Sequence, residues 1–316
     1  MPLADRSFVT GGSARARYPD VDAPPDGLRL TDDPRLARLV TIFEEMGSVL
    51  VCYSGGIDSA FVLAVAHLVL GDKCIGMTAV SPSLASFELE DAVSIARGIG
   101  ARHELVESHE IEDEAYAKND VDRCFHCKSE LYRLSTKKQS DWKVAHVANG
   151  TNLDDLGDYR PGLEAAKEAG ARSPLVEAGL TKADVRALSQ AIGLGIWDKP
   201  AAACLSSRLP YGTRVTRERL AQIGSLEDEI HKLGIRQARV RWHASSTESP
   251  IAVKETAIAR IEIGRDEMLK AFDARDAIVA AGKRLGFTYV TLDLAGYRTG
   301  SHNEVLTSRR SLPVVS

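Results

Sequence analysis

Short apolar runs alternate with amphipathic segments along the greater part of the chain. The runs at 49–51, 74–80 and 144–148 have the length and composition of buried strands. The segments at 60–70 and 86–99 have the composition and spacing of helices. Strands that alternate with helices favour a parallel sheet covered by helices on both faces. We therefore expect the fold class α/β, with a doubly wound parallel sheet and a ligand site beyond the carboxyl ends of its strands.

The pattern changes beyond Pro210. The elements expected there are a charged helix at 216–233, a strand at 237–242, a segment at 251–254, a long helix at 266–285 and a strand at 287–294. They predict a second, smaller α/β domain at 213–316, after a first domain at 31–212. Residues 1–30 are rich in Gly, Pro, Arg and Asp without periodicity, so we expect a flexible arm there.

Composition and net charge indicate a globular protein and argue against a membrane or nucleic-acid-binding protein. The chain has 316 residues, of which 44% are apolar and 27% charged, as in ordinary globular proteins. Its net charge of −4 provides no sequence-wide attraction to nucleic acid. No apolar run approaches the ~20 residues that span a bilayer, and the N-terminal segment lacks the apolar core of a secretion signal. We expect a cytoplasmic protein that binds neither nucleic acid nor a membrane.

The string Ser54-Gly-Gly-Ile-Asp-Ser59 lies between an expected strand and an expected helix. Gly55 and Gly56 allow backbone N–H groups to approach an anion, and the helix dipole adds positive charge there. Ser54 and Ser59 add hydroxyl donors, and Asp58 is expected to orient phosphates or magnesium. A strand–helix turn that merely needs glycine would explain the glycine pair alone. The whole string resembles the PP-loop of ATP pyrophosphatases, the adenine nucleotide alpha hydrolase-like enzymes, and it is not a Walker A loop because no Gly-Lys-Ser/Thr follows.

A second polar loop, at 149–160, follows another expected strand. Two interpretations of its acidic residues stay open. They hold magnesium or a ribose, or they cap the helix after Pro161. Thr181 and Asp184 have the spacing of a capping box and predict a helix start, without chemistry.

Five cysteines in a cytoplasmic chain argue against a disulfide framework. Cys52 and Cys74 fall in expected strands and are predicted to be buried. Cys124 and Cys127 form a C-x-x-C pair, which is typical of redox, zinc or iron–sulfur sites. If Cys204 folds back onto this pair, three thiolates would suit a [4Fe-4S] cluster with one open iron.

Cys204 lies in a loop bracketed by prolines. Lys199 and Arg208 are close in sequence, and a cation near a thiol stabilises the reactive thiolate. A loop cysteine without a role is the alternative for Cys204 taken alone.

Four motifs in this order resemble the LarE family, the ATP-dependent sulfur transferases that mature lactate racemase. They are Ser54–Ser59, Arg123-Cys-Phe-His-Cys-Lys128, Gly150–Gly162 and Ala203–Gly212. The resemblance runs from about Leu36 into the second domain. It implies that ATP, with Mg²⁺, activates a carboxylate of pyridinium-3,5-biscarboxylic acid mononucleotide and that sulfur then replaces AMP, giving a thiocarboxylate of the nickel-pincer nucleotide.

The same resemblance implies two sulfur sources. Some members sacrifice the sulfur of the cysteine that matches Cys204, and dehydroalanine remains. Others carry cysteines at the positions of Cys124, Cys127 and Cys204 and are thought to bind a [4Fe-4S] cluster that holds an extra sulfide. This chain has all three, which favours the cluster type.

Three arginines are expected to bind substrate. Arg239 and Arg241 are spaced by two on an expected strand and so share a face, while Arg208 lies in the Cys204 loop. A solvated charged face is the alternative for the first two. The resemblance also implies a homo-oligomer, a trimer or hexamer, formed through the second domain.

Another PP-loop adenylating enzyme, either a tRNA thiolase or an amidotransferase-type synthase, is the alternative function. An amide-forming enzyme would not need the three cysteines, and a tRNA thiolase should present a strongly basic surface.

Overall fold

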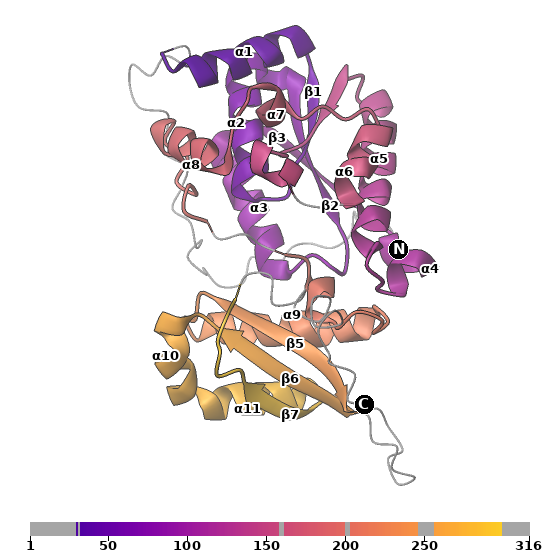
Figure 1. The fold of residues 1–316 in the computed structure, drawn as a ribbon, viewed down its shortest axis with the longest axis vertical. Coiled ribbons are helices and arrows are strands. Elements are labelled where there is room, and N and C mark those ends of the chain that lie inside the picture. Colours follow the sequence, from indigo (N-terminus) through magenta and orange to yellow (C-terminus); the bar gives the residue numbers. More distant parts are fainter. Residues whose placement is uncertain (1–29, 31, 158–160, 200–202, 246–255, 299–316) are drawn as a thin grey trace, which may run out of the picture.

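The computed structural model describes residue 30 and the ranges 32–157, 161–199, 203–245 and 256–298. Apart from Leu30, the expected arm lies outside these residues, as does the segment at 251–254. The described residues build two sheets with their helices (Figure 1). Among them, no helix is long and apolar enough to cross a membrane.

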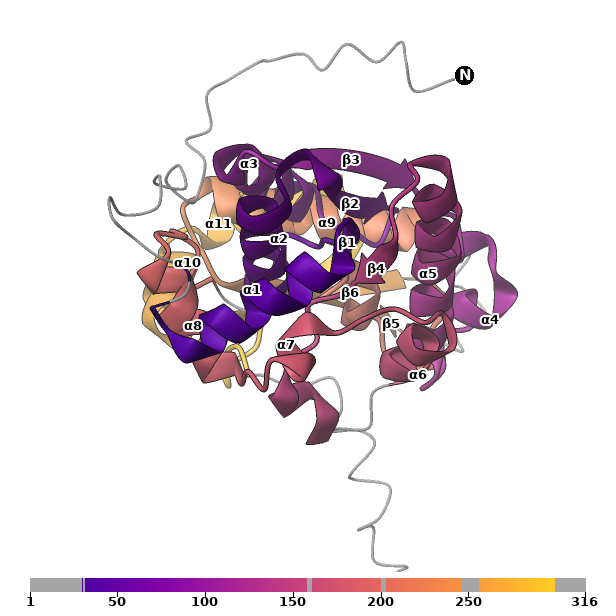
Figure 2. The same cartoon turned by 90° about the horizontal axis from the view of Figure 1, so that it is seen from above.

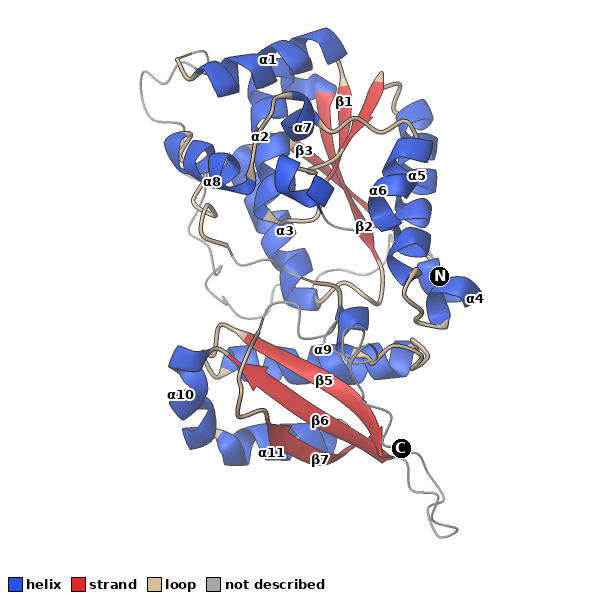
Figure 3. Cartoon of the chain, viewed as in Figure 1, coloured by secondary structure: helices blue, strands red, loops and turns tan. Residues whose placement is uncertain are grey.

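The first sheet consists of β1 (Val49–Cys52), β2 (Cys74–Val80), β3 (Arg102–Glu107) and β4 (His146–Ala148). All its neighbouring strands are parallel, in the order β3-β2-β1-β4 (Figure 3). Leu50 on β1 pairs with Ile75 on one side and with Val147 on the other. The carboxyl end of β1 therefore lies between those of β2 and β4. The loop that contains Ser54–Ser59 begins there.

Helices cover both faces of this sheet (Figure 2). One group consists of α1 (Pro34–Met46), α2 (Ile57–Leu70), α3 (Ser86–Ile99), α7 (Pro174–Glu177) and α8 (Lys182–Ala191), and the other of α5 (Arg123–Asp141) and α6 (Pro161–Glu168). Val49 and Val51 pack with the first group, and Leu50 and Cys52 with the second. This alternation gives a strand that is apolar throughout. It confirms the predicted fold class, and Cys52 and Cys74 are buried as expected.

Local signals start several of these helices. Asp33 accepts a hydrogen bond from the Arg35 N–H, and Pro34 occupies the first turn of α1. Thr181 and Asp184 form the predicted capping box at the start of α8.

The second sheet consists of β5 (Ala238–Ser245), β6 (Thr256–Ile263) and β7 (Phe287–Leu292). β5 and β6 are antiparallel, whereas β6 and β7 are parallel. α9 (Arg217–Lys232), α10 (Met268–Asp273) and α11 (Arg275–Arg284) pack on its apolar side. Val240 and Trp242 point to that side, so Arg239 and Arg241 share the opposite, charged face.

Two expectations for this region were inaccurate. The long helix at 266–285 is two helices, because the backbone departs from helical geometry at Ala274 (φ −87°, ψ 7°). β6 was not predicted as a strand. The two sheets lie on either side of position 212, while the division into domains at that point stays a prediction.

Candidate functional site

The loop between β1 and α2 carries the predicted nucleotide-binding residues. Gly55 has φ +75°, in the left-handed region that favours glycine. A Cβ atom here would lie 2.8 Å from the Cβ of Ala92 on α3. Both the backbone conformation and the packing against α3 therefore require glycine.

Hydroxyl groups brace this loop. The Oγ of Ser59 accepts a hydrogen bond from the Ser54 N–H at 3.2 Å and donates to the Gly56 carbonyl at 3.0 Å. Among the described residues no side chain caps α2, so its first N–H groups are open to another acceptor. Together with the helix dipole, these groups give the loop the character of an anion site.

The loop after β4 lies against the first turn of α2. A Cβ on Gly150 would lie 2.7 Å from the backbone nitrogen of Ser59. From this loop, Asn152 donates through Nδ2 to Oδ1 of Asp58 at 3.2 Å. The ammonium group of Lys182, the first residue of α8, forms an ion pair with Oδ2 of Asp58. Asp58 is thus held from two sides at the carboxyl edge of the sheet.

The sequence pattern did not reveal Lys182 or Asn152 as site residues. Lys182 lies inside the capping box, and that box explains the local pattern without any chemistry. Its contact with Asp58 joins residues 124 positions apart, which no local signal reports.

Acidic residues after β4 act as caps where the structure describes them. Asp154 accepts a hydrogen bond from the Lys182 N–H at 2.8 Å, and Asp155 accepts one from the Asn152 N–H at 3.1 Å. Asp158 lies outside the described residues. These contacts are to the start of α8 and within the loop, not to the helix after Pro161, so both readings of the acidic residues stay predictions.

Cys124 and Cys127 lie in the first two turns of α5, which begins at Arg123. Residues three apart share one face of a helix, so the two thiols are neighbours. Cys124 is exposed and Cys127 is partly buried. The cysteine pair thus belongs to α5 itself.

A hydrogen bond joins the two segments that carry the three cysteines with predicted functions. Arg123, next to Cys124, donates through Nη1 to the carbonyl oxygen of Ser206, two residues beyond Cys204, at 2.9 Å. Burial raises the pKa of the Cys127 thiol to about 12, and Lys128 opposes this shift. Among the described residues, no three His, Cys, Asp or Glu side chains are arranged to hold a single metal ion.

Cys204 is exposed, and the 3₁₀ turn at 205–208 follows it. The two cations expected to stabilise its thiolate have carboxylate partners. Lys199 is buried and pairs with Glu88 at 3.1 Å and with Asp91 at 3.0 Å. Arg208 is buried and pairs with Glu227.

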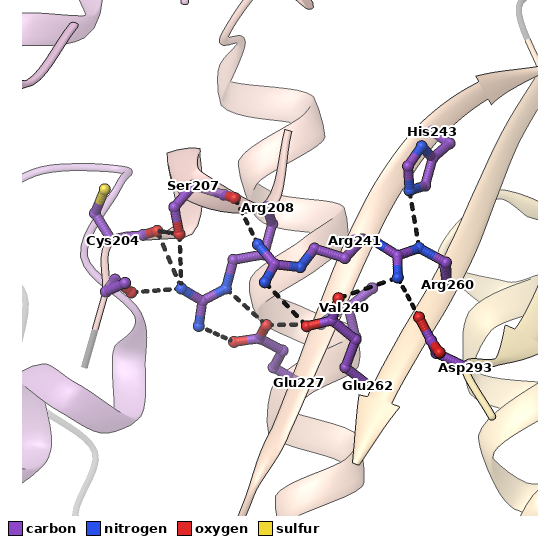
Figure 4. Close-up of polar contacts among 11 residues, drawn as sticks. Cys204, Ser207, Arg208, Glu227, Val240, Arg241, His243, Arg260, Glu262 and Asp293 are labelled. Atoms are coloured by element: carbon purple, nitrogen blue, oxygen red, sulfur yellow. Dashed lines mark hydrogen bonds and ion pairs between the residues drawn. The ribbon is translucent and has the colours of Figure 1, made fainter. Parts of the chain in front are cut away.

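Arg208 also holds the loop that carries Cys204 (Figure 4). Its Nε and Nη2 groups donate to the two carboxylate oxygens of Glu227, on α9, at 2.9 and 3.0 Å. Its Nη1 group donates to the carbonyl oxygens of Ala203 at 2.5 Å and Cys204 at 3.1 Å. Glu227 also accepts a hydrogen bond from the Val240 N–H of β5 at 2.9 Å. One carboxylate therefore joins the Cys204 loop, α9 and β5.

A second buried arginine continues this network. Arg241 donates to the Ser207 carbonyl oxygen at 2.7 Å and pairs with Glu262 at 2.9 Å. Arg260 pairs with Glu262 at 3.1 Å and also with Asp293 (Figure 4). The charged face of the second sheet is thus bonded to the backbone of the Cys204 loop.

Arg239 lies on the same face, with its guanidinium 4.7 Å from the ring centre of Tyr297. Burial lowers the pKa of Arg239, and the nearby charges of Arg208 and Arg241 lower it further. The structure therefore gathers the three arginines predicted to bind substrate. Their role in substrate binding stays a prediction.

We expect Glu227→Ala to destabilise the protein by about 3–5 kcal/mol, because it leaves the buried Arg208 charge without its carboxylate. The free energy of unfolding in urea measures this loss. Glu114→Ala is the matched control, since it removes a carboxylate from an ion pair with Arg214 that is exposed. Equal stability of the two variants would contradict a central role for the Arg208–Glu227 pair.

No protein-family model matches the chain. An uncharacterized protein of Synechocystis sp. is 43% identical over 277 residues, which cover 87% of this chain and 99% of that protein. The tRNA-specific 2-thiouridylase MnmA of Rickettsia felis is 25% identical over 200 residues, which cover 51% of this chain and 54% of that enzyme. This partial likeness agrees with a PP-loop fold for the first sheet and its helices.

A third relative has a named activity and is similar over most of its length. The pyridinium-3,5-bisthiocarboxylic acid mononucleotide synthase of Lactiplantibacillus plantarum is 37% identical over 272 residues, which cover 86% of this chain and 94% of that enzyme. Identity at this level over most of both proteins shows that the chain belongs to the LarE family of pyridinium-3,5-bisthiocarboxylic acid mononucleotide synthases.

Proposed function

We propose that the chain is an ATP-dependent sulfur transferase that converts a carboxylate of pyridinium-3,5-biscarboxylic acid mononucleotide to a thiocarboxylate. The observation that carries this proposal is the hydrogen bond that joins the segment of Cys124 and Cys127 to the loop of the exposed Cys204, in a chain 37% identical to the named synthase. The anion site at the start of α2 supports the other half of the reaction, in which ATP activates the carboxylate.

The first step activates the carboxylate with ATP, which enters as its magnesium complex. A carboxylate oxygen attacks the α-phosphorus, the bond from that phosphorus to pyrophosphate breaks, and an acyl-adenylate forms. The leaving group on the acyl carbon then becomes AMP instead of oxide. The N–H groups of α2 and the hydroxyls of Ser54 and Ser59 hold the departing pyrophosphate. Lys182 and Asp58 flank the same phosphates.

The substrate carries a phosphate of its own, which requires cations. Arg208, Arg239 and Arg241 gather three guanidinium groups beside the Cys204 loop, where Glu227 pairs with Arg208 and Glu262 with Arg241. A cluster of guanidinium groups suits the phosphate of a mononucleotide. Arg239, stacked on Tyr297, is the arginine that we expect to contact it.

We propose a [4Fe-4S] cluster held by Cys124, Cys127 and Cys204. Iron–sulfur clusters are bound by thiolates, and the three thiols fit such a group in kind, with the two segments that carry them joined by the hydrogen bond from Arg123 to the Ser206 carbonyl oxygen. When bound, the cluster supplies a sulfide as the sulfur donor. The protein contributes the first two turns of α5 and the anchored Cys204 loop, which present the thiols together.

In the alternative reading, Cys204 itself supplies the sulfur. Its thiolate displaces AMP from the acyl-adenylate and forms a thioester. A base then removes the α-proton of residue 204, the Cβ–S bond breaks, and the thiocarboxylate leaves with its electron pair while dehydroalanine remains. This reading uses Cys204 without Cys124 and Cys127.

A tRNA thiolase or an amidotransferase-type synthase is less favoured. The likeness to MnmA covers about half of the chain, and the net charge of −4 offers no general attraction to tRNA. Cytoplasmic residence stays a prediction from composition, and assembly into a trimer or hexamer through the second sheet and its helices stays a prediction by resemblance.

Pyrophosphate release tests the proposed function directly. We expect release from ATP only when pyridinium-3,5-biscarboxylic acid mononucleotide is present, together with a product in which sulfur replaces carboxylate oxygen. Pyrophosphate is measured enzymatically and the product by mass spectrometry. Release that depends on tRNA or ammonia instead would contradict the proposal.

Gly150→Ala should weaken ATP binding. The new Cβ would lie 2.7 Å from the Ser59 backbone nitrogen, and overpacking of this kind costs about 1–3 kcal/mol, or roughly tenfold to hundredfold in affinity if it displaces the loop. Calorimetric titration with ATP measures the change. Gly157→Ala is the control, because no atom of the described residues lies within 4 Å of its added Cβ. Equal affinities would place ATP away from this loop.

Anaerobic purification separates the two sulfur sources. We expect bound iron and sulfide with a visible absorption band, and loss of both in Cys124→Ser and Cys127→Ser. An iron-free wild type that turns over once and loses hydrogen sulfide from residue 204 would support the sacrificial reading instead. Cys74→Ser, at a cysteine buried in β2, controls for general loss of a thiol.

A further inference from the structure

A set of buried hydrogen bonds fastens the segment before α5 to the chain just after Cys204. Asn119 is fully buried and has φ +59°, a conformation that asparagine tolerates better than most residues. Its Nδ2 group donates to the carbonyl oxygens of Pro210 at 2.8 Å and Thr213 at 2.9 Å. The backbone carbonyl oxygen of Asn119 accepts a hydrogen bond from the Gly212 N–H at 3.0 Å.

Arg123 extends these contacts to the cysteines. It directly precedes Cys124, and its buried Nη1 group donates to Oδ1 of Asn119 and, at 2.9 Å, to the Ser206 carbonyl oxygen. Ser206 is two residues beyond Cys204. Within the described part of the chain, no carboxylate forms an ion pair with Arg123.

Tyr116, on α4 (Glu114–Ala117), makes a third contact between the same segments. Its hydroxyl lies 2.6 Å from the Oγ of Ser206 and 2.5 Å from the Oγ of Ser83, and the Ser206 hydroxyl donates to Ser83 at 2.9 Å. All three side chains are buried. We name Tyr116, Asn119 and Arg123, with their partners at 206–213, the cysteine latch.

We infer that Asn119, supported by Arg123 and Tyr116, is a positioning residue that sets the separation between the Cys204 thiol and those of Cys124 and Cys127. The inference rests on the proposed function. Arg123 is adjacent to Cys124, and its acceptor is two residues from Cys204, so a change in the latch displaces the thiols directly. Displacements of about 1 Å can lower reaction rates roughly a hundredfold.

Chemical cross-linking tests the latch apart from catalysis. A bifunctional alkylating reagent should join the exposed Cys124 and Cys204 in reduced, iron-free protein, as measured by peptide mass spectrometry. Asn119→Gly permits the same φ but removes the amide group, and we expect the cross-linked yield to fall about tenfold. Tyr116→Phe, which removes one hydroxyl, should lower it less. Gln222→Ala is the control, because it removes an amide bonded to Trp242 and Leu285.

The two half-reactions supply a second measurement. Asn119→Gly should retain substrate-dependent pyrophosphate release and lose sulfur transfer, since the described contacts of the latch do not include the Ser54–Ser59 loop. A parallel loss of both half-reactions, or a wild-type cross-linking yield in Asn119→Gly and Tyr116→Phe, would overturn the inference. If the wild type releases no pyrophosphate while cross-linking still falls in the variants, the proposed function is contradicted, but the role of the latch in positioning the thiols is supported. If Asn119→Gly does not fold, Tyr116→Phe decides.

Discussion

The buried pair between Arg208 and Glu227 is the interaction on which the Cys204 loop depends. A buried guanidinium requires partners for its N–H groups, and Glu227 occupies only two of its nitrogens. The third turns toward the carbonyl oxygens of residues 203 and 204 and so fixes the direction of the backbone at the cysteine. Because Glu227 also accepts the Val240 N–H, the loop is placed relative to the second sheet. The exposed thiol of Cys204 thus belongs to a backbone segment that hydrogen bonds to buried side chains hold in place.

This arrangement separates two chemical tasks. The N–H groups of α2, beyond the carboxyl end of β1, suit the phosphates of ATP. The cysteines lie with α5 and with the loop anchored to β5. Sulfur transfer requires that the acyl-adenylate made at one place meet the thiol at the other. The segment from Lys199 to Arg208 connects both, since Lys199 pairs with Glu88 and Asp91 on α3 and Arg208 pairs with Glu227 on α9. Lys199 and Arg208 are both buried.

Much of the first sheet could be predicted from sequence, because β1, β2 and β4 lie in short apolar runs and helices beside it carry capping residues such as Asp33 and Thr181. The helix end at Ala274 and the strand β6 were not predicted: no proline or glycine marks the first, and β6 is interrupted by charged residues on its polar face, Arg260 and Glu262. Within the site, Ser54–Ser59 and the three cysteines were recognised from local strings. Asn119 and Lys182 were not, because their partners, Pro210 and Asp58, are 91 and 124 positions away. Pairing of arginines with buried carboxylates is likewise a tertiary property that spacing does not report.

Charges around Cys204 bear on the sulfur source. Lys199 and Arg208 were expected to stabilise its thiolate, but each pairs with carboxylates, which cancel much of their field at the sulfur. Arg123 differs, because its Nη1 group donates to the neutral oxygens of Asn119 and Ser206, and within the described residues no carboxylate forms an ion pair with it. It directly precedes Cys124 and contacts the residue two positions beyond Cys204. The cation left to act on the cysteines is therefore Arg123, and because it touches both segments its charge suits either sulfur source.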